Sequence, residues 1–191
     1  MKKYKFTVDL FSHAIPNIEK YITNKITKKF DNVLEIGSYE GKSACYWLEN
    51  LMEDNASLTC IDSWEDKLCQ ILFTYNINLV KSDNQSVKSI KGYAKNVLPV
   101  LLNDPPLRKY DFIYVDGDHR EEAVYSDLCL SFNMCKANGL ILCDDYLLLQ
   151  TQEATADGAN CKAGIDKFIE EYKDKIEIIF SDYQILLKRI N

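Results

Sequence analysis

The chain has 191 residues, a length that suits one domain with a real hydrophobic core. Apolar residues make up 47% and charged residues 27%, the values of an ordinary soluble globular protein. The net charge of −6 and the absence of a basic cluster argue against nucleic acid as a main partner. No apolar run approaches the roughly 20 residues that cross a bilayer, so no membrane partner is expected.

The N-terminus and the cysteines indicate the compartment. Residues 1–13 carry the charge of a signal peptide but lack its apolar core and cleavage site. The seven cysteines form no CxxC pair, and most lie inside apolar segments, at Cys45, Cys60, Cys69, Cys129, Cys135, Cys143 and Cys161. We therefore predict reduced cysteines in a cytoplasmic protein, without a zinc site.

Hydrophobic periodicity predicts strands that alternate with helices. In chain order the predicted elements are helix 15–29, strand 32–37, helix 42–52, strand 57–62, helix 67–81, strand 87–91, helix 94–102, strand 110–116, helix 119–136, strand 139–145, helix 164–174 and strands 176–180 and 183–189. Pro105-Pro106 breaks the chain before the fourth strand, and residues 146–163 form a loop.

The order of these elements predicts the fold. Near-continuous apolar strands separated by helices are typical of a parallel sheet that is covered on both faces. Only Ser181-Asp182 separates the last two strands, so they must form an antiparallel hairpin. A parallel sheet closed by one antiparallel strand is the architecture of class I methyltransferases. We predict one domain, with an N-terminal helical extension over 1–30 and a catalytic core over 31–191.

Polar residues follow the strands of the predicted sheet. Ligands bind beyond the carboxyl ends of parallel strands, so the residues at those ends are the first candidates for a site. All five of the first strand ends are acidic, polar or glycine-bearing, at residues 37–43, 62–64, 92–94, 116–119 and 144–145. Together they predict one functional rim.

The pattern Glu35-x-Gly37-x-x-x-Gly41 follows the first strand. Glycines allow a ligand to approach closely, and a helix N-terminus offers free N–H groups. Glu35 stands at the first glycine of the dinucleotide fingerprint, where an acid tolerates a cationic ligand better than a pyrophosphate. The same pattern also suits a tight turn without a ligand. Asp62 either holds a ribose or caps the next helix. Trp64 either packs against one side of an adenine or packs in the core.

The run EIGSYEGKSA resembles motif I of the catechol- and caffeoyl-CoA-type O-methyltransferases. Over residues 31–190 the chain is still more similar to relatives that methylate sugar hydroxyls in macrolide and aminocoumarin biosynthesis. It shares their acid-x-Trp after the second strand, their YDFIYVDGDH block and their DDY after the fifth strand. The resemblance implies a Rossmann-like α/β fold with a seven-stranded, mostly parallel sheet, one antiparallel strand and helices on both faces.

The resemblance also implies S-adenosylmethionine as the cofactor. The residues that it assigns to the methionine end are Glu35, Gly37, Tyr39, Gly41 and Ser43. It assigns Asp62 to the ribose, and it assigns the adenine to Trp64, Gly92, Tyr93 and Ala94.

The acids after the fourth and fifth strands predict a metal site. An alcohol is a poor nucleophile at neutral pH, and a divalent cation lowers its pKa and fixes its direction. Asp116, Asp144 and Asp145 supply carboxylates that favour magnesium or manganese, and the family resemblance places metal ligands at these positions. The alternative is that Asp144 and Asp145 form a solvated turn.

His119 and Asp118 are the predicted catalytic residues. The sugar-methylating relatives also have histidine at the position of His119, and its ordinary pKa near 6.5 allows it to accept a hydroxyl proton. Its alternative is a first-turn helix residue without a role. Asp118 and Glu121 have the spacing of a capping box, so Asp118 is a helix cap, a catalytic residue or both. Arg120 is predicted to lie on the surface.

The acceptor is the least defined partner. The loop 146–163 is long enough to act as a lid, and the first 30 residues could close the other side. The antibiotic-tailoring relatives are longer at the N-terminus, which leaves either a more open pocket or a wall borrowed from a second subunit of a homo-oligomer.

We therefore predict a magnesium-dependent O-methyltransferase that acts on a hydroxyl of a sugar or another small metabolite. One alternative is a methyltransferase that works without metal. Two others are an NAD-binding oxidoreductase, which Glu35 and the terminal hairpin disfavour, and a non-catalytic nucleotide-binding module.

Overall fold

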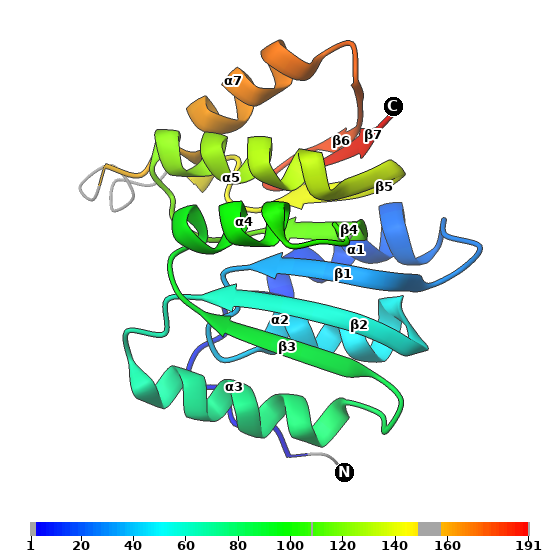
Figure 1. Ribbon diagram of the computed structural model, residues 1–191, viewed down its shortest axis with the longest axis vertical. Coiled ribbons are helices and arrows are strands. Elements are labelled where there is room, and N and C mark those ends of the chain that lie inside the picture. Colours follow the sequence, from blue (N-terminus) through cyan, green and yellow to red (C-terminus); the bar gives the residue numbers. More distant parts are fainter. Residues whose placement is uncertain (1–2, 108, 149–157, 191) are drawn as a thin grey trace.

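A seven-stranded sheet forms the centre of the molecule (Figure 1). The computed structural model describes residues 3–107, 109–148 and 158–190. In chain order the strands are β1 (Phe30–Ile36), β2 (Met52–Asp62), β3 (Ser86–Lys91), β4 (Tyr110–Val115), β5 (Cys135–Cys143), β6 (Ile176–Ser181) and β7 (Ile185–Arg189). Their order across the sheet is β3-β2-β1-β4-β5-β7-β6, and β7 alone runs in the direction opposite to the other six strands. The predicted α/β architecture, with its terminal hairpin, is confirmed.

Helices cover both faces of the sheet (Figure 1). They are α1 (Ile15–Ile18), α2 (Lys42–Tyr46), α3 (Lys67–Val80), α4 (Ala94–Asn103), α5 (Glu121–Met134) and α7 (Cys161–Tyr172). Short helical turns extend α1 on both sides, over Ser12–Ala14 and Glu19–Thr23, and extend α2 over Trp47–Leu51. Among the described residues, no helix combines the length and the apolar character needed to cross a bilayer.

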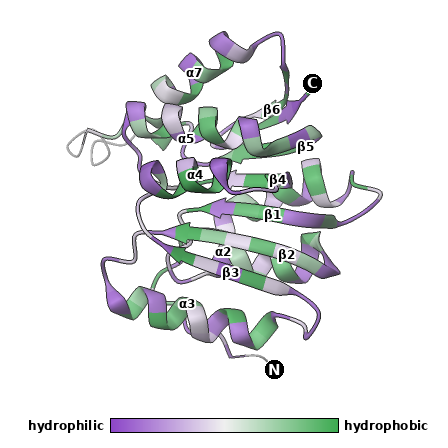
Figure 2. Cartoon of the chain, viewed as in Figure 1, coloured by the Kyte–Doolittle hydropathy of each residue, from purple (hydrophilic) through white to green (hydrophobic). Residues whose placement is uncertain are grey.

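Two hydrophobic cores lie on opposite faces of the sheet. Successive residues of a strand point to opposite faces, so Val33 belongs to the core under α1, α2 and α3, whereas Leu34 belongs to the core under α4, α5 and α7. Both side chains are fully buried. Figure 2 shows the resulting hydrophobic character along the middle of the sheet. These two cores explain why the central strands read as continuous apolar runs.

The N-terminal helix differs from its prediction. Helical spacing predicts 15–29, but the helical backbone spans residues 12–23, and Asn24 ends it. Ile26 lies beyond that end and still packs against the core. An apolar residue at helical spacing therefore reaches the core here from a turn, which periodicity cannot distinguish from a helix.

The strand β5 places the two consecutive acids. It ends at Cys143, so Asp144 and Asp145 lie just beyond the strand instead of inside it. Asn138, in the irregular first half of β5, has a φ of 61°, a left-handed conformation that asparagine tolerates. The end of β5 at Cys143 places the two acids at the carboxyl edge of the sheet.

Candidate active site

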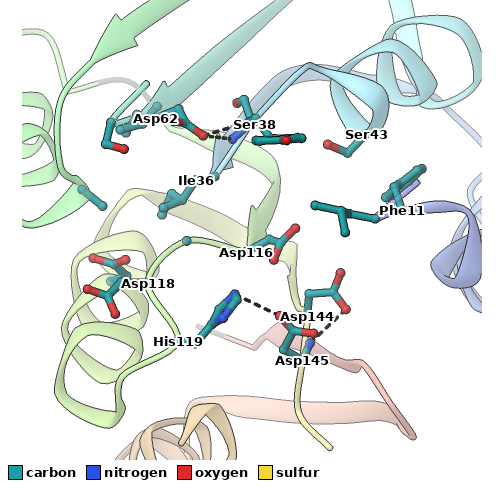
Figure 3. A pocket seen from close by; sticks show the side chains of 18 of the residues that line it. Phe11, Ile36, Ser38, Ser43, Asp62, Asp116, Asp118, His119, Asp144 and Asp145 are labelled. Carbon is teal, nitrogen blue, oxygen red and sulfur yellow. Dashed lines mark hydrogen bonds and ion pairs between the residues drawn. The ribbon is translucent and has the colours of Figure 1, made fainter. Parts of the chain in front are cut away.

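A cavity of about 1030 Å³ lies over the carboxyl ends of the parallel strands. Its lining includes residues that follow each of β1 to β5 and residues of the N-terminal segment, which we define as residues 3–14. Figure 3 shows Ser38 and Asp62 on one side of this cavity, and Asp116, His119 and Asp145 on another. The parallel sheet thus gathers the predicted rim into one site.

Gly37 begins the β1–α2 turn, which we define as residues 37–41. Its φ is 86°, and a Cβ atom built on it would lie 1.7 Å from the carbonyl oxygen of Asp116. Only glycine fits such an approach between two backbones. The N–H of Asp116 in turn donates to the carbonyl of Ile36 over 2.8 Å. The turns after β1 and β4 are therefore locked together at the floor of the cavity.

Asp62 shapes this turn from the end of β2. Its Oδ2 accepts hydrogen bonds from the N–H groups of Ser38 (3.0 Å) and Tyr39 (2.8 Å), and its Oδ1 accepts from the N–H of Trp64 (2.6 Å). Asp62 also lines the cavity. The cap of α3 is Asp66, whose side chain accepts from the N–H of Leu68, so Asp62 is not a helix cap.

Three predicted cofactor residues support the cavity without lining it: Glu35, Gly41 and Trp64. Glu35 is fully buried and accepts hydrogen bonds from Ser38 Oγ (2.6 Å) and Trp47 Nε1 (2.8 Å). Its burial raises the pKa of the carboxyl group above its ordinary value. Trp64 packs against Phe73 in the core, with ring centroids 4.9 Å apart. Both side chains hold the turn from beneath.

The other predicted cofactor residues line the cavity: Gly37, Tyr39, Ser43, Asp62, Gly92, Tyr93 and Ala94. Tyr93 is 51% exposed, and its hydroxyl donates to Glu65. Ala94 begins α4, and Ser43 lies in the first turn of α2. The two helix starts therefore face the same space as the ends of β1, β2 and β3.

Asp118 is not the cap of α5. The helix begins at Glu121 with Arg120 as its N-cap, which contradicts the capping-box prediction. Asp118 accepts a hydrogen bond from the N–H of Arg120 over 3.0 Å and pairs with its guanidinium group. This pairing lowers the pKa of Asp118 below its ordinary value. Arg120 is exposed, as predicted, but it also lines the cavity.

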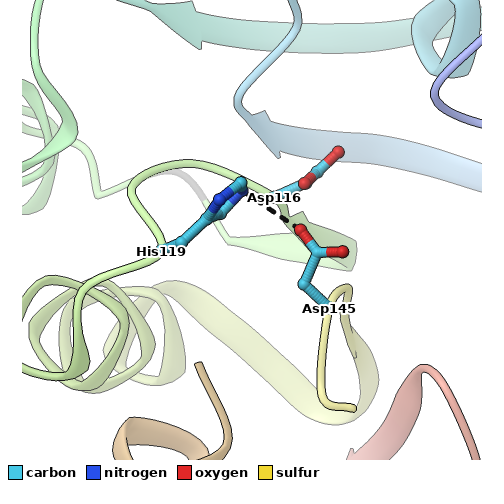
Figure 4. Close-up of side chains that lie close together, drawn as sticks. All are labelled: Asp116, His119 and Asp145. Carbon is cyan, nitrogen blue, oxygen red and sulfur yellow. Dashed lines mark ion pairs between the residues drawn. The ribbon is translucent and has the colours of Figure 1, made fainter. Parts of the chain in front are cut away.

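Asp116, His119 and Asp145 converge at one end of the cavity (Figure 4). One ligand atom of each lies within 4.8 Å of the others, and His119 Nε2 is 3.1 Å from Asp145 Oδ2. We call this group the acid–histidine cluster. The hydrogen bond to Asp145 raises the pKa of His119, and burial followed by the charges of Asp144 and Asp145 raises that of Asp116.

Asp144, the third predicted metal ligand, is not one of the three residues of this cluster although it is adjacent to Asp145 and lines the same cavity. It is 5% exposed, and its carboxylate accepts hydrogen bonds from the Tyr114 hydroxyl and from Gln184 Nε2 (2.9 Å). Burial alone would raise the pKa of Asp144, but these bonds and one from His13 lower it. Asp145 adopts a left-handed φ of 57°, which separates the directions of the two side chains.

Sequence reasoning missed His13, Tyr183 and Asp127, all of which line the cavity. His13 Nε2 lies 3.6 Å from Asp144 Oδ1, and its ring meets that of Tyr183 edge-on at 5.1 Å. The Tyr183 hydroxyl donates to Asp145 over 2.6 Å. The positions of His13 and Tyr183 in the sequence give no indication that the two residues meet. Asp127 could have been found from the sequence, because an acid on the buried face of a helix is unusual and Asp127 shares that face of α5 with Val124.

The N-terminal segment is fastened over the cavity, on the side that the sequence predicts it to close. The N–H and the hydroxyl of Thr7 donate to the Glu40 carboxylate over 2.7 and 2.6 Å. Asn76 hydrogen-bonds to the N–H and the carbonyl of Lys5 and to the carbonyl of Glu40. Half of the predicted lid, residues 149–157 of 146–163, lies outside the described residues.

Comparisons with known proteins identify the family. Residues 34–146 match the methyltransferase domain family. The chain is 28% identical to an uncharacterized protein of Acanthamoeba polyphaga mimivirus, over 73% of this chain and 61% of that one. It is 26% identical to the O-methyltransferase hkm8 of Aspergillus hancockii, over 59% of this chain and 42% of that one. The chain thus spans less than two thirds of the length of these two relatives.

A solved structure shows the same fold. The O-methyltransferase from Bacillus cereus, crystallised with S-adenosylhomocysteine, superimposes with a TM-score of 0.69 at 16% identity. The superposition covers 95% of this chain and 82% of that protein. The predicted class I methyltransferase fold is therefore confirmed, and because the family match covers more than half of its residues, the chain belongs to the methyltransferase domain family.

Proposed function

We propose that the chain transfers the methyl group of S-adenosylmethionine to a hydroxyl oxygen of a sugar or another small metabolite. We further propose that a divalent cation, magnesium or manganese, takes part. The observation that carries this proposal is the acid–histidine cluster, which opens into the same cavity as the β1–α2 turn. A cofactor on that turn and an acceptor at the cluster would meet inside one enclosed space.

The charge of the cavity suits a sulfonium cofactor. Acidic side chains outnumber basic ones in the lining, and they include Asp9, Glu40, Asp62, Asp116, Asp118, Asp144 and Asp145. A positively charged sulfur is favoured in such surroundings, whereas a pyrophosphate is not. Lys42 and Ser43 at the start of α2 suit the carboxylate of the methionine end. Asp62 faces the cavity where the ribose hydroxyls would lie.

The donor set of the cluster fits a hard divalent cation. Asp116 and Asp145 offer carboxylate oxygens and His119 offers an imidazole nitrogen, which leaves further positions for water and an acceptor. When bound, the cation would lower the pKa of the acceptor hydroxyl and fix its direction. Asp144 is linked to the cluster through the Tyr114 hydroxyl, which contacts the carboxylates of both Asp144 and Asp116.

One observation favours a second candidate, the same methyl transfer without metal. His119 Nε2 lies 3.1 Å from Asp145, so the carboxylate could orient the imidazole while the ring accepts the hydroxyl proton. The raised pKa of His119 suits a base better than the lowered pKa of Asp118 does. Asp118 is then a positioning residue for Arg120 at the cavity mouth.

The N-terminal segment would form one wall for the acceptor. Phe11, Val8 and Leu10 of this segment all line the cavity; Phe11 is buried, whereas Val8 and Leu10 are 44% and 56% exposed. His13 and Tyr183 add polar groups next to the acidic end. An acceptor with a polar, hydroxylated face and an apolar remainder fits this lining best.

Methyl transfer from radiolabelled S-adenosylmethionine to a panel of hydroxylated acceptors tests the proposal. We expect EDTA to abolish turnover and magnesium or manganese to restore it. Asp145→Asn should lower kcat by about 100-fold or more, because it removes a charged ligand. Asp174→Asn is the matched control, since Asp174 is exposed and far from the cluster in the chain.

The outcomes separate the two candidates. Undiminished turnover in EDTA, with a loss of activity in His119→Gln, would leave only the metal-free candidate. Calorimetry with S-adenosylhomocysteine tests the cofactor itself. If neither this compound nor S-adenosylmethionine binds, the proposed function is wrong.

A further inference from the structure

Asp127 is a buried acid that the proposed function does not use. It lies in the second turn of α5 and is 2% exposed, among the apolar residues of that helix face. None of the described residues donates a hydrogen bond to its carboxyl group. Because this carboxyl group lines the cavity, its oxygens are available for hydrogen bonds to a bound ligand.

The cavity lining around Asp127 is made of small and apolar residues, and we call this part of the cavity the slot. A Cβ atom built on Gly117 would lie 3.6 Å from Asp127 Oδ2 and 3.1 Å from Ile36 Cγ2. Ala94 and Ala123, at the starts of α4 and α5, line the same cavity, and the two helices pack against each other. The slot is thus lined by small residues and by the apolar side chain of Ile36.

The slot lies on the side of the cavity that the cofactor base would occupy. Gly92, Tyr93 and Ala94 follow β3, and Gly117 follows β4. Asp62, next to β3 in the sheet, faces the cavity between this slot and the β1–α2 turn. A cofactor whose ribose meets Asp62 and whose methionine end meets that turn would direct its base toward α5.

We propose that Asp127 recognises the amino edge of the adenine ring of the cofactor; this inference rests on the proposed use of S-adenosylmethionine. A carboxyl oxygen would accept a hydrogen bond from the exocyclic amino group of adenine. In its protonated form the other oxygen would donate to the neighbouring ring nitrogen, which completes a two-bond pair. Asp127 is thus a specificity residue and takes no part in methyl transfer.

The electrostatics of Asp127 agree with this pairing. Burial, followed by the charge of Asp118, raises the pKa of Asp127 to about 7. The protonated carboxyl group is therefore accessible at neutral pH, and it offers one donor and one acceptor. These are the two groups that the amino edge of adenine requires.

Binding measurements on two ligands test the inference. We compare S-adenosylhomocysteine with an analogue in which hydrogen replaces the exocyclic amino group, using calorimetry at fixed pH. The wild-type protein should prefer the adenine compound by about tenfold or more, because the analogue leaves the carboxyl oxygen unpaired. Asp127→Leu should bind both compounds equally and the adenine compound more weakly. Asp127→Asn should keep the preference, since an amide also offers a donor and an acceptor.

Thermal unfolding separates recognition from a structural role. Without ligand, Asp127→Leu should unfold about 2–4 °C higher than the wild type, because it removes an unpaired buried carboxyl group. Asp111→Leu is the matched control. Asp111 lies at the start of β4, at the end of the strand that is opposite to Gly117. Asp111 accepts hydrogen bonds from the N–H groups of Asp31 and Asn32, so its loss should lower Tm and leave both affinities unchanged.

The binding results either support or overturn the proposed recognition of adenine by Asp127. A wild-type protein that binds the two compounds equally overturns the inference without any variant, and so does an Asp127→Leu protein that keeps the preference. In both cases S-adenosylhomocysteine still binds, and the proposed function stands. If S-adenosylhomocysteine does not bind to the wild type, the proposed function and this inference both fail.

Discussion

Replacing Gly37 with alanine tests whether the cavity depends on the contact between the turns after β1 and β4. The new Cβ atom would lie 1.7 Å from the carbonyl oxygen of Asp116 and 2.5 Å from its carbonyl carbon. Both atoms belong to the backbone, so no side-chain rotation relieves the overlap. The two turns must separate by more than an ångström, which displaces Asp116 from the acid–histidine cluster.

Two costs add in this variant. Alanine at a φ of 86° costs about 1–2 kcal/mol, and forcing a methyl group into a filled space costs about 1–3 kcal/mol more. We expect the free energy of unfolding to fall by about 2–5 kcal/mol in urea titrations followed by tryptophan fluorescence. The affinity for S-adenosylhomocysteine should fall as well, because the β1–α2 turn moves.

Gly158→Ala is the matched control for Gly37→Ala. Gly158 has a φ of 71°, but a Cβ atom built on it meets none of the described residues within 4 Å. This variant should therefore show only the left-handed cost of about 1–2 kcal/mol, and it should bind S-adenosylhomocysteine like the wild type. Equal losses of stability in the two variants would refute the close approach of the turns.

Two further predictions concern the N-terminal segment and the histidine. Asn76→Ala removes the buried amide that joins this segment to the β1–α2 turn. We expect the free energy of unfolding to fall by about 2–3 kcal/mol and the segment to be cleaved early in limited proteolysis. Asn78→Ala, on the exposed side of α3, should change neither quantity. In EDTA, the raised pKa of His119 should contribute to the free energy of unfolding. This contribution should be fully present below about pH 6.5 and should be lost as the pH rises through the raised pKa. A His119→Gln protein whose stability has the same pH profile as that of the wild type would contradict this.

The sequence was sufficient to predict the architecture, because a strand that is buried on both faces must lie between two layers of helices. Val33 and Leu34 are adjacent and both apolar, which is typical of a strand between two layers of helices. The two-residue gap at Ser181-Asp182 required the antiparallel hairpin. The end of the first helix was not predictable, since Ile26 keeps the helical spacing after the helix has ended.

The rim of the site was also predictable, because parallel strands bring their carboxyl ends to one edge. The directions of individual side chains were not. Glu35 turns beneath the β1–α2 turn, and the left-handed φ of Asp145 directs it to His119 whereas Asp144 turns toward Gln184. A pattern of residue types carries no information about these backbone angles.

Other members of the site come together only through the tertiary fold. His13 and Tyr183 lie near opposite ends of the chain, and they meet because β7 pairs with β5 and the N-terminal segment crosses the cavity. Asp127 is different, since an acid on the buried face of a helix is visible in the sequence once α5 is placed. Its position next to Gly117 required the structure.

The most direct test of the proposed metal-dependent methyl transfer is a crystal structure with manganese and S-adenosylhomocysteine, measured for the anomalous signal of manganese. We expect one peak between Asp116, His119 and Asp145, with the sulfur of the cofactor product facing it across the cavity. Asp145→Asn crystals should lose the peak. S-adenosylhomocysteine bound in the cavity without manganese at the acid–histidine cluster would contradict the metal site and leave the metal-free candidate.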